Sequence, residues 1–447
     1  MSPPRQQHWA IAGGGLLGMT LAWDLANEHR KITLFESAPS PGGLASAWRL
    51  GDIVWDRHYH VTLLSDSALR GLLSELDLDK EMRWTRTRTG FYGNGRLHPF
   101  SGALEFVRFP LLNPIEKLLF ALAVLHASRL RSPESIEALT VEQWLTRISG
   151  KSVFRKIWLP LLRAKLGENY RTTSATFIWA TIQRLYAARR SGLREELFGY
   201  LPGGYSRMLE TFAAALRRKG VAIELNSRIR EIRTGEPSGV TVSLDNSSAL
   251  FDRVIVTTPA PIAAKLCPQL TSHEARLLNG VHYEGIICAS MLLRRPLSDF
   301  YITNIADSSI PLTGVIEMSS LVDREMFGGR ALVYLPRYLP PEHPAFDCSD
   351  DDLKAEFLSA VRLMHPLLKD DEIVAFRISR ARHVYPRPTP GSAARAPLID
   401  TSIPGVHILN SANIPAGTLN VNETVQLARR EAKRLDESAR SPHDLAA

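Results

Sequence analysis

The chain of 447 residues has few cysteines, and their positions exclude two common kinds of small scaffold. Cys267, Cys288 and Cys348 form no C-x-x-C pair and no motif with a nearby histidine. An odd, sparse set of cysteines argues against a disulfide framework and against a zinc site, and it is typical of a reducing compartment. We therefore expect no bound metal, and we expect the three thiols to be buried and to pack as small hydrophobic groups.

The sequence also lacks a long apolar run. No segment reaches the ~18 apolar residues that a membrane-spanning helix requires, and residues 1–8 are too short and polar for a signal peptide. The longest candidate, residues 115–125 (IEKLLFALAVL), is followed by Arg129 and Arg131. It predicts either a core helix or an interfacial helix that lies on a membrane. We expect a cytoplasmic protein, either free or peripheral at the inner face of the membrane.

The overall composition is that of a folded protein with a basic surface. Hydrophobic residues make up 45% of the chain and charged residues 22%, and the formal net charge is +8. The length predicts two or three domains. The positive charge is compatible with an ordinary basic surface, with an anionic substrate or with an acidic membrane surface. The basic residues are spread along the whole chain, so we expect no nucleic-acid partner.

The beginning of the chain predicts a βαβ unit that binds a dinucleotide. Residues 8–12 (HWAIA) predict a buried strand, residues 16–28 a helix, and residues 31–35 (KITLF) a second strand. A G-x-G-x-x-G motif lies between the first strand and the helix, and it consists of Gly13, Gly15 and Gly18. Such glycines allow the tight turn, the approach of a pyrophosphate and close packing of helix against strand, while the helix N-terminus attracts the phosphates.

Glu36 indicates which dinucleotide can bind. It follows the second strand, eighteen residues after Gly18. A carboxylate at this position binds both ribose hydroxyls and disfavours a 2′-phosphate, which argues against NADP. The motif and Glu36 together leave FAD and NAD open.

The rest of the chain alternates between helical and strand-rich stretches. Residues 67–78 and 105–186 predict mainly helices, and residues 91–97 predict a hairpin with an Asn94-Gly95 turn. A helix is expected over residues 207–219 and a last helix over residues 422–435. Further strands are expected at residues 221–225, 228–232, 240–244, 251–257, 285–293, 331–335 and 406–409.

The segment after Glu36 reads SAPSPGGLA and contains the pair Gly42-Gly43. Two adjacent glycines let backbone N–H groups approach a phosphate or a flavin without a Cβ in the way. With the Gly-rich turn and Glu36, this pair resembles the flavin amine oxidase, protoporphyrinogen oxidase and phytoene desaturase superfamily. Residues 220–232 (GVAIELNSRIREI) and 251–259 (FDRVIVTTP) resemble two later segments of that family. The resemblance covers roughly residues 8–60, 200–260 and 400–430.

The resemblance implies a fold, a cofactor and a class of reaction. The fold is α/β, with a Rossmann-like FAD-binding domain of the glutathione reductase type, an inserted mixed α+β substrate domain and a helical subdomain. The expected FAD-binding domain comprises residues 1–66, 200–262 and 401–435, the substrate regions are residues 67–199 and 263–400, and residues 436–447 are a tail. The implied enzyme is an FAD-dependent oxidoreductase (oxidase, dehydrogenase or desaturase type). It removes hydride from a C–C or C–N bond of a largely apolar small molecule. An anionic substrate and a lipid-like substrate are both compatible with this implication. The pattern is most similar to bacterial members called protoporphyrinogen oxidase-like.

The same resemblance implies a set of FAD-binding residues. These are Gly13, Gly15, Leu16, Leu17, Gly18, Glu36, Ser37, Gly42, Gly43, Leu44, His58, Tyr59, Ile229, Thr257, Pro259, Asn410, Ser411, Asn420, Val421 and Asn422. The family usually follows its closing strand with Gly-Asp, whereas here Asn410-Ser411-Ala412 stands at that place. In the segment GTLNVNET that follows, backbone N–H groups at the start of the last helix are expected to face the flavin.

Few catalytic side chains are expected, because a flavin ring carries the hydride chemistry itself. The segment DRHYH (residues 56–60) offers His58 or His60 as an acid or base and Arg57 as an anion contact, and each histidine has a structural role as its alternative. Lys165, in an apolar setting, is either structural or catalytic. Three tyrosines are candidates either for a cavity wall or for the core: Tyr283, Tyr334 and Tyr385.

Two groups of arginines are either solvated faces or contacts for an anionic substrate. They are Arg184, Arg189, Arg190 and Arg194, and Arg86, Arg88 and Arg96. Together with DRHYH they keep open a non-redox flavoenzyme that resembles UDP-galactopyranose mutase. The altered Asn410-Ser411-Ala412 segment keeps open a flavin-binding protein without catalysis.

Overall fold

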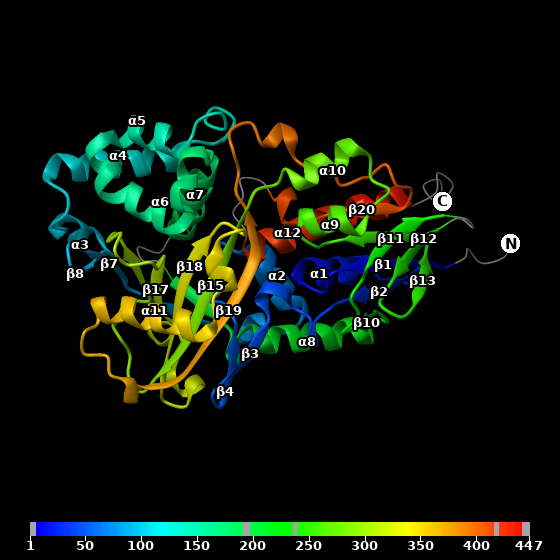
Figure 1. The fold of residues 1–447 in the computed structure, drawn as a ribbon, viewed down its shortest axis with the longest axis horizontal. Coiled ribbons are helices and arrows are strands. Elements are labelled where there is room, and N and C mark those ends of the chain that lie inside the picture. Colours follow the sequence, from blue (N-terminus) through cyan, green and yellow to red (C-terminus); the bar gives the residue numbers. More distant parts are fainter. Residues whose placement is uncertain (1–5, 191–196, 236–238, 415–419, 440–447) are drawn as a thin grey trace.

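The computed structural model describes residues 6–190, 197–235, 239–414 and 420–439, without the side chains of residues 185–190 and 439. The molecule is elongated (Figure 1). A parallel sheet with its helices occupies one end, and a group of helices and a large mixed sheet, one above the other in this view, make up the other (Figure 1). The mixed α/β class expected from the sequence is confirmed.

The parallel sheet is assembled from five short strands that are far apart in the sequence. In spatial order they are β10 (Ala222–Glu224), β2 (Arg30–Phe35), β1 (Gln7–Ala12), β14 (Arg253–Val256) and β20 (Val406–Ile408). Because successive side chains of a strand point to opposite faces, Trp9 and Ile11 of β1 pack on one face while Ala10 and Ala12 pack on the other.

Both faces of this sheet are covered, as a parallel sheet requires. One face packs against four helices: α1 (Leu16–Leu25), α2 (Ser67–Glu75), α8 (Gly204–Arg218) and α12 (Val421–Ala439). The other face packs against an antiparallel sheet of β11 (Glu231–Thr234), β12 (Val240–Ser243) and β13 (Ser248–Phe251), with the helices α9 (Ala260–Leu266) and α10 (Ser272–Asn279).

The mixed sheet has seven strands. Their order is β19 (Ile373–Pro386), β15 (Tyr283–Leu293), β18 (Ala331–Leu339), β17 (Gly314–Glu317), β16 (Ile302–Ile305), β7 (Thr89–Gly93) and β8 (Arg96–Pro99). The expected hairpin is confirmed, since Asn94 and Gly95 join β7 and β8 with φ values of 53° and 69°. Every residue of β15 is buried, which explains its almost continuous apolar sequence.

Each face of the mixed sheet also has a partner. The helix α11 (Asp350–Met364) covers one face. The other face packs against residues of short strands that follow the βαβ unit or precede α8. These short strands are β3 (Ala47–Leu50), β4 (Ile53–Asp56), β5 (Thr62–Leu63) and β9 (Leu197–Tyr200), and β6 (Arg83–Arg86) pairs with β9.

The helical end of the molecule contains α3 (Ala103–Arg108), α4 (Pro114–Arg129), α5 (Val141–Val153), α6 (Leu159–Leu166) and α7 (Thr176–Arg190). Asn113 caps α4, because its side chain accepts a hydrogen bond from the Glu116 amide while Glu116 bonds back to the Asn113 amide. Among the helices of the described residues, none has both the length and the apolar character needed to cross a membrane.

The structure corrects three details of the sequence prediction. The helix expected over residues 207–219 begins earlier, at Gly204. The strand expected over residues 228–232 begins only at Glu231, because the amides of Asn226 and Ser227 bond to Ala38 and Glu36 instead of to a sheet partner. Cys267 and Cys288 are buried as expected, whereas Cys348 is exposed at the end of a surface turn.

Candidate functional site

The Gly-rich turn lies at the carboxyl end of β1, where the chain enters α1. Gly13 adopts φ 120°, a conformation that favours glycine, and an added Cβ there would lie 2.5 Å from Oγ1 of Thr257. A Cβ on Gly18 would lie 2.0 Å from the carbonyl oxygen of Gly13. These two glycines are therefore required for the turn itself and for close packing of α1 against it.

Gly15 differs, because a Cβ added there would meet no heavy atom within 4 Å. The second glycine pair approaches this open position: the Gly42 amide donates to the Gly14 carbonyl at 2.7 Å, and a Cβ on Gly43 would lie 3.3 Å from Cα of Gly15. No side chain caps the start of α1, and its first turn, with Leu16 and Leu17, carries no acidic residue. A helix N-terminus without a protein cap, beside open space, fits a phosphate group.

Glu36 follows β2 and lies beside the turn. Its Oε2 accepts a hydrogen bond from the Gly14 amide at 2.9 Å, and its Oε1 accepts one from the Ala38 amide at 2.8 Å. Ser37 donates its hydroxyl to the same Oε1. The Glu36 carbonyl accepts from the Ser227 amide, which brings the loop containing Ile229 to this carboxylate. The carboxylate is thus fixed at the place where a ribose is bound in dinucleotide folds.

The segments that follow β14 and β20 each contribute one buried polar atom without a partner among the described residues. Among the described residues, Nδ2 of Asn410 and Oγ1 of Thr258 are buried and form no hydrogen bond. Buried donors of this kind are normally paired, so a bound molecule that accepts from them is expected here. Ser411 lies 3.3 Å from the hydroxyl of Tyr283, and that hydroxyl accepts from the Ala260 amide, next to Pro259. Thr258 was missed in the sequence although it stands between two predicted residues.

The start of α12 is organised by two asparagines. Asn420 caps the helix by accepting from the Glu423 amide at 3.0 Å. The side chain of Asn422 accepts from the amides of Ala68 and Leu69 at the start of α2, at 2.9 and 3.2 Å. Its side chain is therefore used in helix capping, and the backbone around Val421 is what remains for a cofactor. Residues 415–419 of the GTLNVNET segment lie outside the described part of the chain.

Taken together, these groups fit FAD. The open position at Gly15 and the uncapped start of α1 suit the pyrophosphate, and Glu36 suits the ribose. The unpartnered donors at Thr258 and Asn410 suit a polar group that extends from the end of the parallel sheet toward Tyr283.

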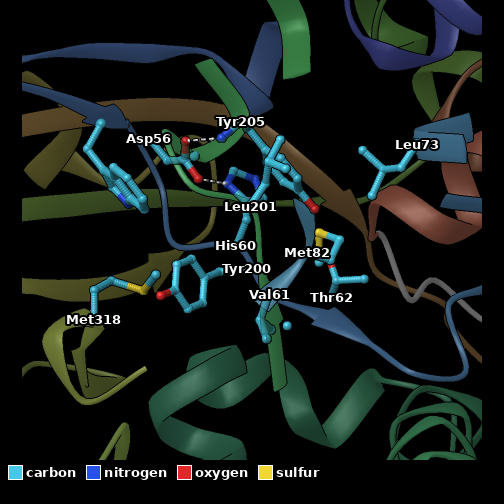
Figure 2. A pocket seen from close by; sticks show the side chains of 13 residues that line it. Asp56, His60, Val61, Thr62, Leu73, Met82, Tyr200, Leu201, Tyr205 and Met318 are labelled. Atoms are coloured by element: carbon cyan, nitrogen blue, oxygen red, sulfur yellow. Dashed lines mark hydrogen bonds and ion pairs between the residues drawn. The ribbon is translucent and has the colours of Figure 1, made fainter. Parts of the chain in front are cut away.

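The segment DRHYH begins at the end of β4 and lines a small cavity. Oδ1 of Asp56 accepts from the Tyr205 amide at 2.8 Å, and Oδ2 lies 3.6 Å from Nδ1 of His60, whose ring lies 4.6 Å from that of Tyr205 (Figure 2). The cavity is lined by Trp55, Asp56, His60, Val61, Thr62, Leu73, Met82, Gly199, Tyr200, Leu201, Gly204, Tyr205 and Met318. Asp56 thereby holds the start of α8 by a hydrogen bond, and its second oxygen places a carboxylate beside the ring of His60.

His58 and Arg57 lie in different surroundings from His60. Burial lowers the pKa of His58 to about 3, with further lowering by the charges of His60 and Arg57. Its imidazole is therefore uncharged at neutral pH, and Nδ1 lies 3.5 Å from the hydroxyl of Ser379. Burial also lowers the pKa of Arg57, whose Nε is buried and forms no hydrogen bond within the described residues.

Tyr59 links this segment to the mixed sheet. Its hydroxyl lies 3.0 Å from that of Tyr338 on β18, and the Tyr338 ring lies 5.7 Å from that of Tyr385 on β19. Nζ of Lys165 lies 3.2 Å from the centre of the Tyr338 ring. Of the other candidate tyrosines, Tyr334 donates to the Asp56 carbonyl. Tyr338 was missed, although its spacing of four from Tyr334 places both on one face of a strand.

Two of the predicted arginines form ion pairs with carboxylates. Arg184 pairs with Asp66 at 3.2 Å, and Arg88 pairs with Glu105 at 3.4 Å. Arg194 and the side chains of Arg189 and Arg190 lie outside the described part of the chain.

Comparison with known proteins gives one family. The model of the family described as flavin containing amine oxidoreductase matches residues 18–436. A curated relative, the 15-cis-phytoene desaturase of Capsicum annuum, is 24% identical over 288 residues, which is 60% of this chain and 49% of the relative. The chain spans about half to two thirds of the length of the first curated relatives that it matches.

Solved structures share the fold. That of a putative protoporphyrinogen oxidase from Exiguobacterium sp. 255-15 superposes with a TM-score of 0.78 at 19% identity, covering 98% of this chain and 100% of the other. Reduced UDP-galactopyranose mutase superposes with a TM-score of 0.72 at 14% identity, covering 97% and 96% of the two chains. At these identities the similarity establishes the fold alone.

Proposed function

Because the chain belongs to the family of flavin-containing amine oxidoreductases, we propose that it is an FAD-dependent oxidoreductase that removes hydride from a C–C or C–N bond of a largely apolar small molecule. The observation that carries this proposal is the open, uncapped helix start at Gly15, opposite Gly42-Gly43 and beside Glu36. Bound FAD supplies the hydride acceptor. The protein therefore has to hold the flavin, orient the substrate and exclude water.

We propose that residues 1–66, 200–262 and 401–435 form the FAD-binding unit. This division is supported by the parallel sheet, whose five strands all come from these three segments. Within it, the turn from Gly13 to Gly18 holds the pyrophosphate, Glu36 holds the ribose, and the backbone at Gly43 and Val421 approaches the flavin. Thr258 is added to the proposed set, which already contains Asn410, because both supply buried donors.

We propose His60, rather than His58, as the residue that holds or moves a proton during turnover. His60 lines the cavity of Figure 2 and is oriented by a carboxylate, Asp56. His58 is held uncharged by burial and lies against Ser379 instead. Arg57 is partly buried and its Nε forms no hydrogen bond among the described residues, so it remains a candidate contact for an anionic group of flavin or substrate.

The proposal is tested by the cofactor and by its reduction. Purified protein is expected to show the two visible bands of oxidised flavin and to release FAD on denaturation. Under anaerobic conditions, an amine or a hydrocarbon substrate should bleach these bands, and oxygen or a quinone should restore them. A colourless protein that takes up no added FAD contradicts the proposal. Turnover of a UDP-sugar by the reduced protein alone, without net electron transfer, supports the mutase alternative instead.

We further propose that the α3–α4 face contacts an anionic membrane surface. We define this face by five side chains, each between 50% and 71% exposed: Leu104, Val107, Ile115, Leu118 and Leu122. The two helices are adjacent, since Lys117 on α4 donates to the carbonyl of Val107. They lie at the end of the molecule remote from the parallel sheet (Figure 1).

Charge on this face favours lipid headgroups as the partner. Its two carboxylates are already neutralised: Glu105 pairs with Arg88, and Glu116 pairs with Lys156. Lys117 and the exposed Arg108 lie among the apolar side chains. A helix with exposed leucines and neighbouring basic groups is typical of binding to an anionic interface.

A further inference from the structure

Three ionisable side chains lie together behind the aromatic wall of Tyr338 and Tyr385. Lys165 stands near the end of α6, and its Nζ lies 3.2 Å from the centre of the Tyr338 ring and 5.1 Å from that of Tyr385. Glu284, on β15, is the register partner of Tyr385. Arg387 directly follows β19. We use the name Lys165 recess for the region bounded by the side chains of Lys165, Glu284, Tyr338 and Tyr385.

The arginine and the glutamate of this group neutralise each other. Nε of Arg387 lies 3.3 Å from Oε1 of Glu284, and Asn169 donates to the same oxygen at 2.9 Å. Arg387 also donates to the hydroxyls of Thr172 and Thr173. Glu284 is completely buried, and these contacts hold its Oε1, whereas its Oε2 forms no hydrogen bond among the described residues.

Lys165 is left without a counterion of its own. Within the described part of the chain its ammonium group forms only the two ring contacts, and no hydrogen bond or ion pair involves it. Two carboxylates act on Arg387, namely Glu284 and Glu342, whereas only Glu284 acts on Lys165, and it does so without a hydrogen bond or ion pair. A protonated Lys165 ammonium is therefore a buried cation with no anion bonded to it, and such a charge is unfavourable unless an anion accompanies it.

The recess borders the region that we propose to contain the flavin. The hydroxyl of Tyr338 reaches that of Tyr59, which stands between His58 and His60. Tyr283, the neighbour of Glu284 in β15, contacts Ser411. On its other side the recess is apolar, because Phe177 stacks on Tyr385 with ring centres 5.7 Å apart.

We propose that the Lys165 recess binds a carboxylate group of the substrate, so that the substrate is an apolar molecule with one acidic end. This inference rests on the proposed function and specifies its substrate class. The Lys165 ammonium donates to the carboxylate, and the hydroxyl of the Tyr59–Tyr338 pair that keeps a free proton supplies a second bond. The apolar part of the substrate lies along Tyr338, Tyr385 and Phe177.

The same charges disfavour an amine in the recess. A protonated amine would face Lys165 and Arg387 as like charges. Of the Glu284 carboxylate only Oε2, which forms no hydrogen bond among the described residues, is open to it, because Oε1 accepts from Asn169 and lies 3.3 Å from Nε of Arg387. A neutral molecule would leave the Lys165 charge uncompensated. The geometry therefore favours an acid over an amine, even though the family takes its name from amine oxidation.

The test compares three probes of equal chain length on the purified holoprotein: octanoate, octanamide and octylamine. Binding is measured by titration calorimetry, so that the readout does not depend on turnover. Octanoate should bind at least about tenfold more tightly than octanamide, because a hydrogen bond to a charged group is stronger than a neutral one. Octylamine should bind more weakly than octanamide. Equal affinity for octanoate and octanamide, or no binding of octanoate, overturns the proposal.

Three variants locate the effect. In Lys165→Met the preference for octanoate over octanamide should fall to about one, and in Lys165→Arg it should persist. Glu284→Gln removes the competing negative charge and keeps an oxygen for Asn169, so octanoate should bind more tightly than to the wild type. A preference that survives in Lys165→Met overturns the assignment. If Lys165→Met does not fold, Glu284→Gln decides the question. This variant should bind octanoate more tightly and octylamine more weakly than the wild type, and the absence of these opposite shifts overturns the assignment.

The outcome is separable from that of the proposed function. Flavin content is measured on the same samples by absorbance after denaturation. Protein without flavin that still prefers octanoate in a Lys165-dependent way contradicts the oxidoreductase proposal and supports the recess. Flavin-containing protein without this preference contradicts the recess alone.

Discussion

The hydroxyl groups of Tyr59 and Tyr338 lie 3.0 Å apart and join the loop after β4 to the mixed sheet. Burial raises the pKa of both phenols, so the contact is a hydrogen bond between two neutral groups. It brings the segment that contains His58 and His60 against the wall of the Lys165 recess. The two proposed regions of the site are thereby held in one arrangement.

Replacing Tyr338 by phenylalanine should lower the rate of flavin reduction by substrate while leaving FAD content unchanged. The lost hydrogen bond should lower the free energy of unfolding by about 1 kcal/mol. Tyr92→Phe is the matched control, because the Tyr92 hydroxyl bonds to the Leu363 carbonyl elsewhere in the sheet. Denaturant unfolding and anaerobic flavin reduction measure both effects. Equal rates of flavin reduction in the two variants would contradict a role for Tyr338 at the site.

Gly15→Ala should fold normally and bind FAD weakly. Gly15 has an extended backbone with φ −70° that alanine adopts without strain, and its added Cβ meets no protein atom within 4 Å. The methyl group would instead occupy the space proposed for the pyrophosphate. Gly71→Ala, on α2 and also with open space, is the control that should keep FAD. Thermal unfolding of the apoproteins and FAD titration distinguish the two variants. Tight FAD binding by Gly15→Ala would contradict the placement of the pyrophosphate at Gly15.

Gly18→Ala should destabilise the fold itself, in contrast to Gly15→Ala, which should affect only FAD binding. Its Cβ would lie 2.0 Å from the Gly13 carbonyl oxygen, so the turn must shift. We expect loss of stability by about 1–3 kcal/mol from overpacking, whether or not FAD is present. Urea unfolding of the apoprotein checks this, and an unchanged midpoint would show that the turn is looser than described.

Asp56→Asn should slow flavin reduction by about tenfold or more if His60 holds a proton during turnover. The asparagine oxygen can still accept from the Tyr205 amide, but the negative charge beside His60 is lost. Asp66→Asn, another buried carboxylate that accepts a backbone amide, serves as the control. Equal rates of flavin reduction in Asp56→Asn and the wild type would remove His60 from the proposal.

Lys165→Met should stabilise the apoprotein most at low pH. Burial lowers the pKa of Lys165 from 10.5 to about 7, so between these values the unfolded chain binds the proton more strongly than the folded chain. The free energy of unfolding of the wild type therefore rises with pH across this window, and below about pH 7 the full cost of the buried charge is present. The gain in melting temperature should be larger at about pH 6 than at about pH 10. Lys433→Met, at an exposed position, should show no such difference.

Leu118→Ser combined with Leu122→Ser should weaken binding to anionic vesicles by more than tenfold. Each leucine that leaves water contributes up to about 1.5–3 kcal/mol. Leu250→Ser is the matched control, because Leu250 is 49% exposed on β13, remote from the α3–α4 face. Flotation with phosphatidylglycerol vesicles, compared with phosphatidylcholine vesicles, measures the effect. Equal losses in both variants, or no vesicle binding by the wild type, would contradict the membrane proposal.

Local sequence determined the nucleotide-binding end of the protein. The strand before Gly13, the helix after Gly15 and the strand before Glu36 are all present as expected. Each depends on neighbours in the sequence: apolar residues that form a strand, glycines that permit a tight turn, and a carboxylate at a fixed distance from them. The Asn94-Gly95 turn was predictable for the same reason.

Tertiary structure decided the substrate side, where the groups that meet are far apart in the chain. Lys165, Glu284 and Arg387 come from three elements, and only the pairing of β15 with β19 and the packing of α6 bring them together. The sequence contained one signal, the carboxylate of Glu284 within the buried strand β15. A single buried charge does not indicate which distant residue pairs with it. Asn422 shows the same limit, since its side chain caps a helix more than 350 residues earlier. Short-range patterns fix backbone conformation, whereas the balance of buried charge depends on which distant side chains the fold places in contact.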